Sequence, residues 1–177
     1  MPRRQIRERT EELLRFCDLI DYRKRSVRKL SGGMKRKLMV CRALLTEPEI
    51  LLLDEPTAGM DPISRRQMWN LLRRLNEQNL TILLTTHYIE EAQSLCSRVA
   101  LMQKGHLQEV NTPAAFIESL GNHAVDVSTS NGVETHYFHE RRDAIAYLSE
   151  IGEKAALRET TLEDVFVERV GIHLTQK

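Results

Sequence analysis

The sequence predicts an α/β fold with parallel strands. Residues 50–54 and 80–85 are short, continuously apolar runs, the pattern of strands that are buried on both faces. Helix-forming segments lie before the first run, between the two runs and after the second. Parallel strands need a crossover connection, usually a helix, so this alternation favours a parallel sheet.

The elements follow one another without repeats or low-complexity segments. Apolar residues recur at helical intervals over residues 5–20, and a basic, turn-prone stretch follows at 21–29. Pro48 and Pro56 limit the helix and the strand that come next. The expected elements up to residue 103 are helices at 5–20, 34–45, 62–77 and 89–96, and strands at 49–54, 80–85 and 98–103.

The pattern changes after Gly105. Asn131-Gly132 separates the alternating runs 123–129 and 133–138, which predicts a β-hairpin. Helices are expected at 140–151 and 161–170. We place a boundary near residues 111–113, which divides the chain into a first domain, 1–112, and a small α+β C-terminal extension, 113–177.

Composition narrows the class of protein. Of the 177 residues, 41% are apolar and 29% are charged, with a net charge of +1, which is typical of soluble globular proteins and indicates no polyanionic partner. The three cysteines form no CxxC pair, so neither a disulfide framework nor a zinc site is expected. No segment has the roughly 20 apolar residues that span a bilayer, so a membrane role would require a partner.

Two consecutive acids end the first apolar run, in ILLLDEP at 50–56. Side chains alternate along a strand, so Asp54 and Glu55 point in different directions and can have different roles. Asp54 is a candidate magnesium ligand and Glu55 a candidate for polarising the water that attacks a γ-phosphate. The alternative is that Asp-Glu-Pro only ends a strand and starts a turn.

Three further features have both a functional and a structural interpretation. Ser31-Gly32-Gly33 precedes a helix, where exposed amides and the helix dipole favour a phosphate, although Ser31 would also serve as an ordinary helix cap. His87 follows the strand LTILLTT, at the end of a sheet where ligands bind, but a lone histidine is often a surface or core residue. Asp61 precedes Pro62 and suits a helix N-cap.

In order and spacing, LSGGMKRKLMVCRALLTEPEILLLDEPTAGMDP followed by TILLTTH resembles the ATP-binding-cassette (ABC) ATPases, closely over residues 10–112. The resemblance implies a partial RecA-like P-loop NTPase sheet with a helical signature subdomain. It also implies that ATP and Mg²⁺ are bound, and that Ser31, Gly32 and Gly33 touch ATP held by a second ATPase subunit. Asp54 matches the magnesium-site acid, Glu55 the catalytic base, Asp61 the dimer-contacting aspartate and His87 the switch histidine.

Met34, the Tyr88-Ile89-Glu90-Glu91-Ala92 run and TLEDVF in the tail look like exporter ATPases that pair with separate membrane permeases. The expected function is therefore energising export from the cytoplasmic face of the plasma membrane, without a nucleic-acid partner. Two alternatives stay open, a non-catalytic remnant and an ABC ATPase that acts on nucleic acid or the ribosome.

The phosphate-binding loop GxxxxGK[ST] does not occur in the 177 residues. We therefore expect a truncated or split cassette that does not hydrolyse ATP alone, leaves apolar strand edges unpaired and tends to aggregate. A basic stretch from Arg23 to Lys37 is a candidate for binding nucleic acid or acidic lipid, but a solvated helical surface is the simpler interpretation. Trp69 is expected to be a packing residue.

Overall fold

The computed structural model describes residues 3–130 and 132–174 of the chain. It contains two compact units, Met1–His87 and Tyr88–Lys177, each of which is described by itself. The boundary expected near residue 112 was based on the change in sequence pattern and stays a prediction. In the described residues, no helix has both the length and the apolar character needed to cross a bilayer.

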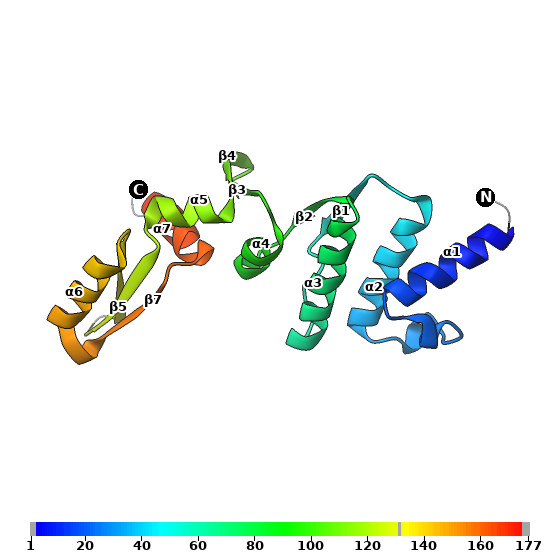
Figure 1. Cartoon of the computed structure of the whole chain (residues 1–177), viewed down its shortest axis with the longest axis horizontal. Coiled ribbons are helices and arrows are strands. Elements are labelled where there is room, and N and C mark those ends of the chain that lie inside the picture. Colours follow the sequence, from blue (N-terminus) through cyan, green and yellow to red (C-terminus); the bar gives the residue numbers. More distant parts are fainter. Residues whose placement is uncertain (1–2, 131, 175–177) are drawn as a thin grey trace. The chain divides into compact units, whose positions relative to one another are not determined.

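The first unit begins with helices. Helix α1 (Arg3–Phe16) is followed by two short 3₁₀ turns, η1 (Ile20–Tyr22) and η2 (Val27–Lys29), and then by α2 (Gly32–Ala43) and η3 (Leu44–Thr46) (Figure 1). Helix α1 ends at Phe16, four residues before the predicted end at residue 20. The chain turns at Asp18, which has a left-handed φ of 58°.

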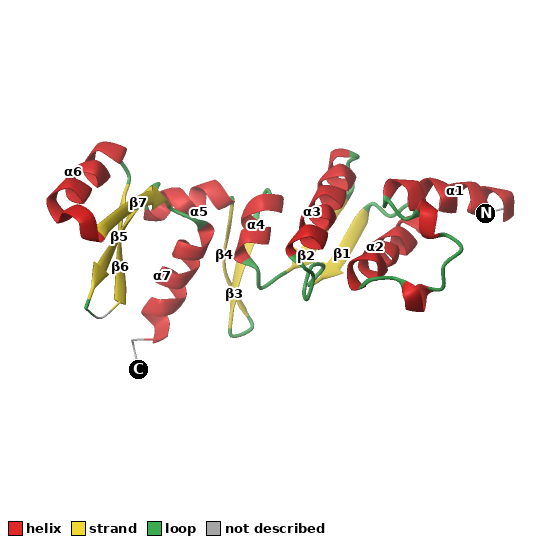
Figure 2. Cartoon of the chain, turned by 90° about the horizontal axis from the view of Figure 1, so that it is seen from below, coloured by secondary structure: helices red, strands yellow, loops and turns green. Residues whose placement is uncertain are grey.

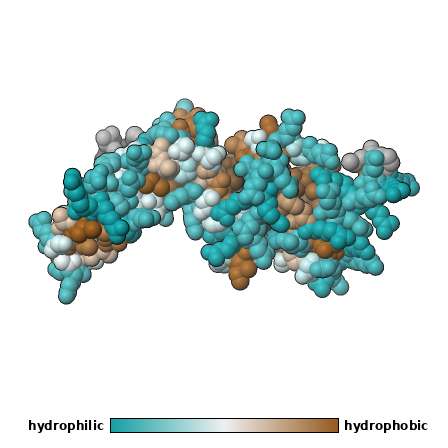
Figure 3. All heavy atoms as spheres, viewed as in Figure 1, coloured by the Kyte–Doolittle hydropathy of each residue, from teal (hydrophilic) through white to brown (hydrophobic). Residues whose placement is uncertain are grey.

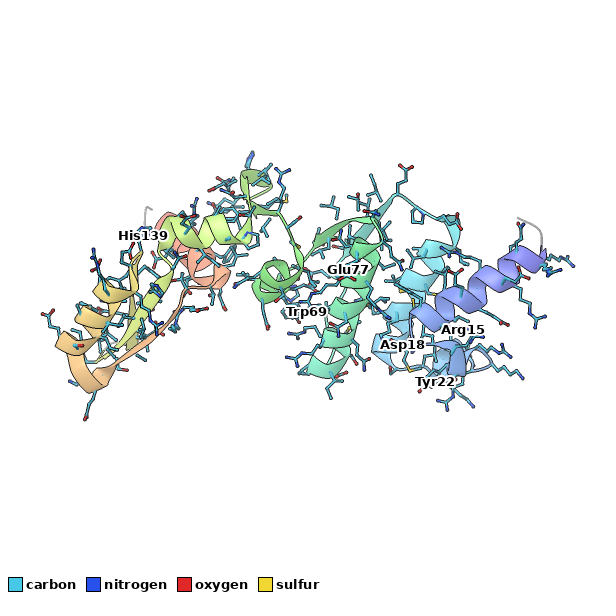
Figure 4. The ribbon with its side chains drawn as sticks, in the orientation of Figure 1. Arg15, Asp18, Tyr22, Trp69, Glu77 and His139 are labelled. Atoms are coloured by element: carbon cyan, nitrogen blue, oxygen red, sulfur yellow. The ribbon has the colours of Figure 1, made fainter. Side chains whose placement is uncertain are left out.

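Two parallel strands form the sheet of this unit. Strand β1 (Ile50–Asp54) pairs with β2 (Thr81–Thr85) in a register that runs from Ile50↔Thr81 to Asp54↔Thr85. Helix α3 (Pro62–Glu77) is the crossover, as predicted, and it buries a row of large side chains that includes Trp69. Figure 4 shows Trp69 and Glu77 on this helix. The packing role expected for Trp69 is confirmed, since only 8% of its surface is exposed.

One face of this sheet carries exposed apolar side chains. Ile50, Leu52 and Leu83 are 60, 69 and 64% exposed, whereas Leu51 on the opposite face is buried. Apolar atoms that reach the visible surface of the chain are brown in Figure 3. Parallel sheets are normally covered on both faces, so in the described residues this strand pair lacks one covering layer.

The second unit opens with α4 (Ile89–Leu95), β3 (Val99–Gln103), β4 (His106–Asn111) and α5 (Pro113–Leu120). Strand β3 was expected in the parallel sheet, but it pairs antiparallel with β4, a strand that the sequence analysis missed. The two strands are joined by a tight turn in which Lys104 and Gly105 both have positive φ. Phe116 on α5 is fully buried against Leu162 and Val165.

The C-terminal part contains a three-stranded antiparallel sheet. Its strands are β5 (His123–Thr129), β6 (Gly132–Phe138) and β7 (Ala155–Glu159), in the order β6-β5-β7, with α6 (Arg141–Ile151) against them and η4 (Gly152–Lys154) before β7 (Figure 2). The β5–β6 hairpin is confirmed, although Asn131 of its turn lies outside the described residues. Strand β7 was not predicted. Helix α7 (Leu162–Leu174) is the last element of the described residues.

An ionic cluster joins this sheet to the start of α7. Arg158 on β7 lies 2.7 Å from Asp126 on β5 and 2.7 Å from Asp164 on α7. Asp164 also accepts hydrogen bonds from the backbone amide and the hydroxyl of Thr161. Hydrogen bonds from Arg158 hold the pKa of Asp126 below its usual value. The cluster therefore ties three elements together through groups that satisfy one another.

Candidate functional site

Asp54 and Glu55 lie at the carboxyl end of β1, where open α/β sheets place their ligand-binding groups. The Thr85 hydroxyl, at the end of β2, donates a hydrogen bond to Asp54 Oδ1. The backbone amide of Glu55 donates to the carbonyl oxygen of Thr85 at 3.0 Å, so the ladder continues one residue beyond β1. Both acids are therefore held by the neighbouring strand.

Glu55 and His87 lie side by side. The backbone of Glu55 is left-handed, with φ 47°, a conformation that costs a non-glycine residue about 1 kcal/mol or more. Its Oε2 atom lies 2.7 Å from Nδ1 of His87, and the two side chains are 33 and 62% exposed. A carboxylate and an imidazole in this position can accept a proton from a water molecule and orient that molecule.

The loop from Ser31 to Gly33 starts α2. The Ser31 hydroxyl accepts a hydrogen bond from the Met34 amide at 3.2 Å, so Ser31 is the N-cap. At Gly33 a Cβ atom would lie 3.0 Å from both Cβ and Oγ of Ser64, whereas Gly32 has open space around it. Gly33 therefore allows the start of α2 to approach the start of α3, and Gly32 stays accessible.

Asp61 is the N-cap of α3. Its Oδ1 accepts hydrogen bonds from the amides of Ile63 at 3.0 Å and Ser64 at 2.9 Å, and Pro62 takes the first helical position. Hydrogen bonds from the side chain and the backbone of Ser64 lower the pKa of Asp61. The structural interpretation of Asp61 is thus correct, while the dimer contact remains a prediction.

The candidate residues form two groups. The first group, at the carboxyl ends of the strands, comprises Asp54, Glu55, Thr85 and His87. The second, at the starts of α2 and α3, comprises Ser31, Gly32, Gly33, Asp61 and Ser64. In the described part of the chain, neither Ser31 nor Asp61 makes a hydrogen bond or ion pair with the first group. Ser31 and Asp61 are thus each held by the start of their own helix and not by the first group.

Asp54 suits a magnesium ion. Mg²⁺ is usually held by one or two carboxylates, with waters and substrate phosphates completing its shell. The exposed Asp54 carboxylate beside the Thr85 hydroxyl offers hard oxygen donors of this kind. Within residues 3–130 and 132–174, no three metal-binding side chains converge to form an all-protein cage. Asp54 and Thr85 are therefore suited to a magnesium ion whose other ligands are waters and the phosphates of a nucleotide.

Sequence reasoning missed Thr85 and Ser64. The signal for Thr85 was its place at the end of the second apolar run, since aligning the ends of the two runs places Thr85 opposite Asp54. Ser64 has no comparable signal, because its importance comes from the approach of α2 to α3.

Comparison with known proteins identifies the class. The family model of the ABC transporter matches residues 3–58. The Nod factor export ATP-binding protein I of Cupriavidus metallidurans is 36% identical over 94% of this chain and 62% of its own length. The daunorubicin resistance ATP-binding protein DrrA3 of Streptomyces coeruleorubidus is 34% identical over 95% of this chain and 62% of its own length. The chain is homologous to these export ATP-binding proteins and carries a segment that matches the ABC transporter family.

Solved structures agree with this assignment. The structure of cbiO1 from Clostridium perfringens, part of the ABC transporter complex cbiONQ, has a TM-score of 0.60 and 29% identity over 63% of this chain and 45% of its own. A cassette of an ABC transporter in its ADP conformation has a TM-score of 0.61 over 66% of this chain at 24% identity, which supports the fold alone. The chain is thus similar to export ATPases and spans about three fifths of the curated relatives it matches.

Proposed function

We propose that this chain is the part of an export ATPase that carries the catalytic base, the magnesium-site acid and the signature loop. The observation that carries the proposal is the contact between Glu55 and His87, 2.7 Å apart at the carboxyl end of the β1–β2 sheet. This pairing is arranged for positioning a water molecule next to a terminal phosphate.

In the proposed reaction, the Glu55 carboxylate accepts the proton of the attacking water. His87, in contact with Glu55, orients that water and the γ-phosphate. Asp54 would hold a magnesium ion, which neutralises charge on the phosphates. Thr85 orients Asp54 through its hydroxyl, so all four residues act at one edge of the sheet.

The second group serves the nucleotide of another cassette. Ser31 and Gly32 are exposed at the start of α2, where amides and the helix dipole favour phosphate oxygens. They make no bond to the chain's own Glu55 or His87, which fits a site that is completed by a second subunit. Asp61, whose carboxylate is ordered by two amides, would contact that subunit.

Closure of two cassettes around ATP would drive an integral membrane permease at the inner face of the plasma membrane. The names of the relatives, which describe Nod factor export and daunorubicin resistance, support an export role. The 177-residue polypeptide by itself would not turn over ATP, because its sequence offers no phosphate-binding loop to hold the nucleotide.

The test is a fusion of this chain to the N-terminal portion of the Nod factor export relative, chosen to carry a GxxxxGK[ST] loop. We expect ATP turnover from the fusion and none from the 177-residue chain. In the fusion, Glu55→Gln should lower turnover by about 10² to 10⁴ and leave ATP binding in place, because only the proton acceptor is removed.

Glu77→Gln is the matched control, since Glu77 is an exposed glutamate at the end of α3 and should tolerate the change (Figure 4). Turnover by the unfused chain would refute its dependence on a phosphate loop. Equal activity of the Glu55 and Glu77 variants, or loss of nucleotide binding in the former, would refute the role of Glu55.

A further inference from the structure

A run of basic residues precedes and includes α2. Between Arg23 and Thr46 the chain has nine lysines and arginines and no acidic residue, although its net charge is only +1. The nine are Arg23, Lys24, Arg25, Arg28, Lys29, Lys35, Arg36, Lys37 and Arg42. We call residues 23–42 the basic segment. Its charge is a local feature that the overall composition hides.

Most of these cations pair with no side chain among the described residues. Arg23 pairs with Glu11 at 3.0 Å, Arg25 lies over the Tyr22 ring, and Lys37 is buried near Asp18. Within the part of the chain that the structure describes, the other six side chains make no ion pair or side-chain hydrogen bond; they are those of Lys24, Arg28, Lys29, Lys35, Arg36 and Arg42. Their charges are available to an anionic partner.

Exposed apolar side chains lie among the unpaired cations. At the start of η2 Val27 is 54% exposed, directly before Arg28 and Lys29, whereas Leu30, which follows η2, is buried. On α2, Met39 is 57% exposed, and it follows Lys35 by one helical turn and precedes Arg42 by another. Helical spacing places these three residues on one stripe. Cations therefore flank an exposed apolar residue at two places.

We propose that the basic segment binds the surface of an anionic phospholipid bilayer. Lysine and arginine would contact the phosphate headgroups, and Val27 and Met39 would enter the boundary between headgroups and acyl chains. Nucleic acid is the other polyanion to consider, but binding to single strands uses stacking on aromatic rings. Tyr22, labelled in Figure 4, is the one aromatic residue near this segment in the sequence. Arg25 covers its ring, with 5.1 Å between the guanidinium carbon and the ring centroid.

The proposal involves neither Glu55 nor His87 and needs no ATP, but the basic segment contains the loop 31–33 that the proposed function assigns to a second cassette, so the variants tested below leave that loop unchanged. It is tested with the full 177-residue chain in a flotation assay, which separates vesicle-bound protein from aggregates. The probes are vesicles of phosphatidylcholine alone and vesicles with added phosphatidylglycerol. We expect binding to the anionic vesicles only, and weaker binding as the salt concentration rises.

Changing Lys24, Arg28 and Lys29 together to Gln should weaken this binding at least tenfold, since each cation near an anionic surface contributes about fivefold. The matched control changes Arg141, Arg142 and Lys154 to Gln, which removes the same charge from exposed positions of the second unit. Val27→Ser should weaken binding severalfold without any change in charge. Circular dichroism checks that each variant is folded.

Three results would overturn the proposal. Equal binding to neutral vesicles would mean that an apolar face adsorbs without regard to charge. An equal loss in the control variant would mean that net charge, not the basic segment, is responsible. Tighter binding to a short DNA duplex or single strand than to anionic vesicles at the same salt concentration would assign the segment to nucleic acid.

Discussion

The two sheets of this molecule differ in how completely they are covered. In the β6-β5-β7 sheet, Ala124 and Val125 are fully buried, and an ionic cluster joins the sheet to α7. In the β1–β2 sheet, Leu52 and Leu83 remain more than 60% exposed. The candidate catalytic residues stand on the less complete sheet. The residues proposed for chemistry thus lie on the sheet that exposes more apolar side chains, although β6 of the C-terminal sheet also leaves Val133 66% exposed.

The largest effect should come from the core of the second unit. Phe116→Ala removes a fully buried ring that packs on Leu162 and Val165, which should cost about 3–5 kcal/mol. Leu83→Ala, at an exposed position of the first unit, should cost less than about 1 kcal/mol. Hydrogen exchange of the amides of α5 and of β2 measures each unit separately, as two units need not unfold together. Similar losses at both positions would mean that the β1–β2 face is covered.

A smaller effect is expected for the ionic cluster. Arg158→Met leaves the carboxylates of Asp126 and Asp164 without their cation, at a cost of about 2 kcal/mol because the cluster is partly exposed. This loss of stability should be measured as faster hydrogen exchange of the β7 amides. Arg142→Met removes an exposed arginine of α6 and serves as the control, for which no change is expected. A stable β7 in the Arg158 variant would show that packing alone holds the sheet.

Acid should weaken the same cluster. Burial opposes the ionisation of Asp164, but hydrogen bonds from Arg158 and Thr161 outweigh it and lower its pKa to about 2. A carboxyl group with a lowered folded-state pKa contributes stability above its unfolded pKa of about 3.9, and this is lost as the pH falls toward 2. Exchange at β7, corrected for its intrinsic pH dependence, should therefore indicate lower stability at pH 2.5 than at pH 5.

Asp164→Asn should remove most of this dependence on pH, whereas Asp143→Asn, at an exposed position of α6, should leave it unchanged. If the dependence persisted in the Asp164 variant, other carboxyl groups would be responsible.

The sequence predicted those helices and strands whose residues show a clear local pattern. Apolar runs and caps located β1, α3 and β2 within a residue, and Pro62 after Asp61 marked the start of α3 correctly. Alternation also predicted the β5–β6 hairpin. Strand β4, HLQEVN, was missed because its polar and apolar residues do not alternate cleanly, and β7 was missed because it is short and follows a helix directly.

The local sequence pattern could not predict contacts between residues that are distant in the sequence. The left-handed backbone of Glu55 turns its carboxylate to His87, and no residue preference predicts that conformation for glutamate. The antiparallel pairing of β3 depends on a partner that the sequence analysis did not recognise. The sequence analysis placed Glu55 and His87 at the ends of two parallel strands, which predicts that they share one edge of the sheet but not that they are in contact.

The smallest effect concerns Asp61, the N-cap of the helix that covers the buried face of the β1–β2 sheet. Asp61→Ala removes the acceptor for two amides at the start of α3 and should loosen only that end of the helix, seen as faster exchange there. Asp61→Ser keeps a capping oxygen and should restore most of that stability. If Asp61 also contacts a second cassette, the Ser variant of the fused ATPase should still lose turnover although its helix is intact. Full activity in that variant would mean that Asp61 acts only as a helix cap and makes no contact with a second cassette that ATP turnover requires.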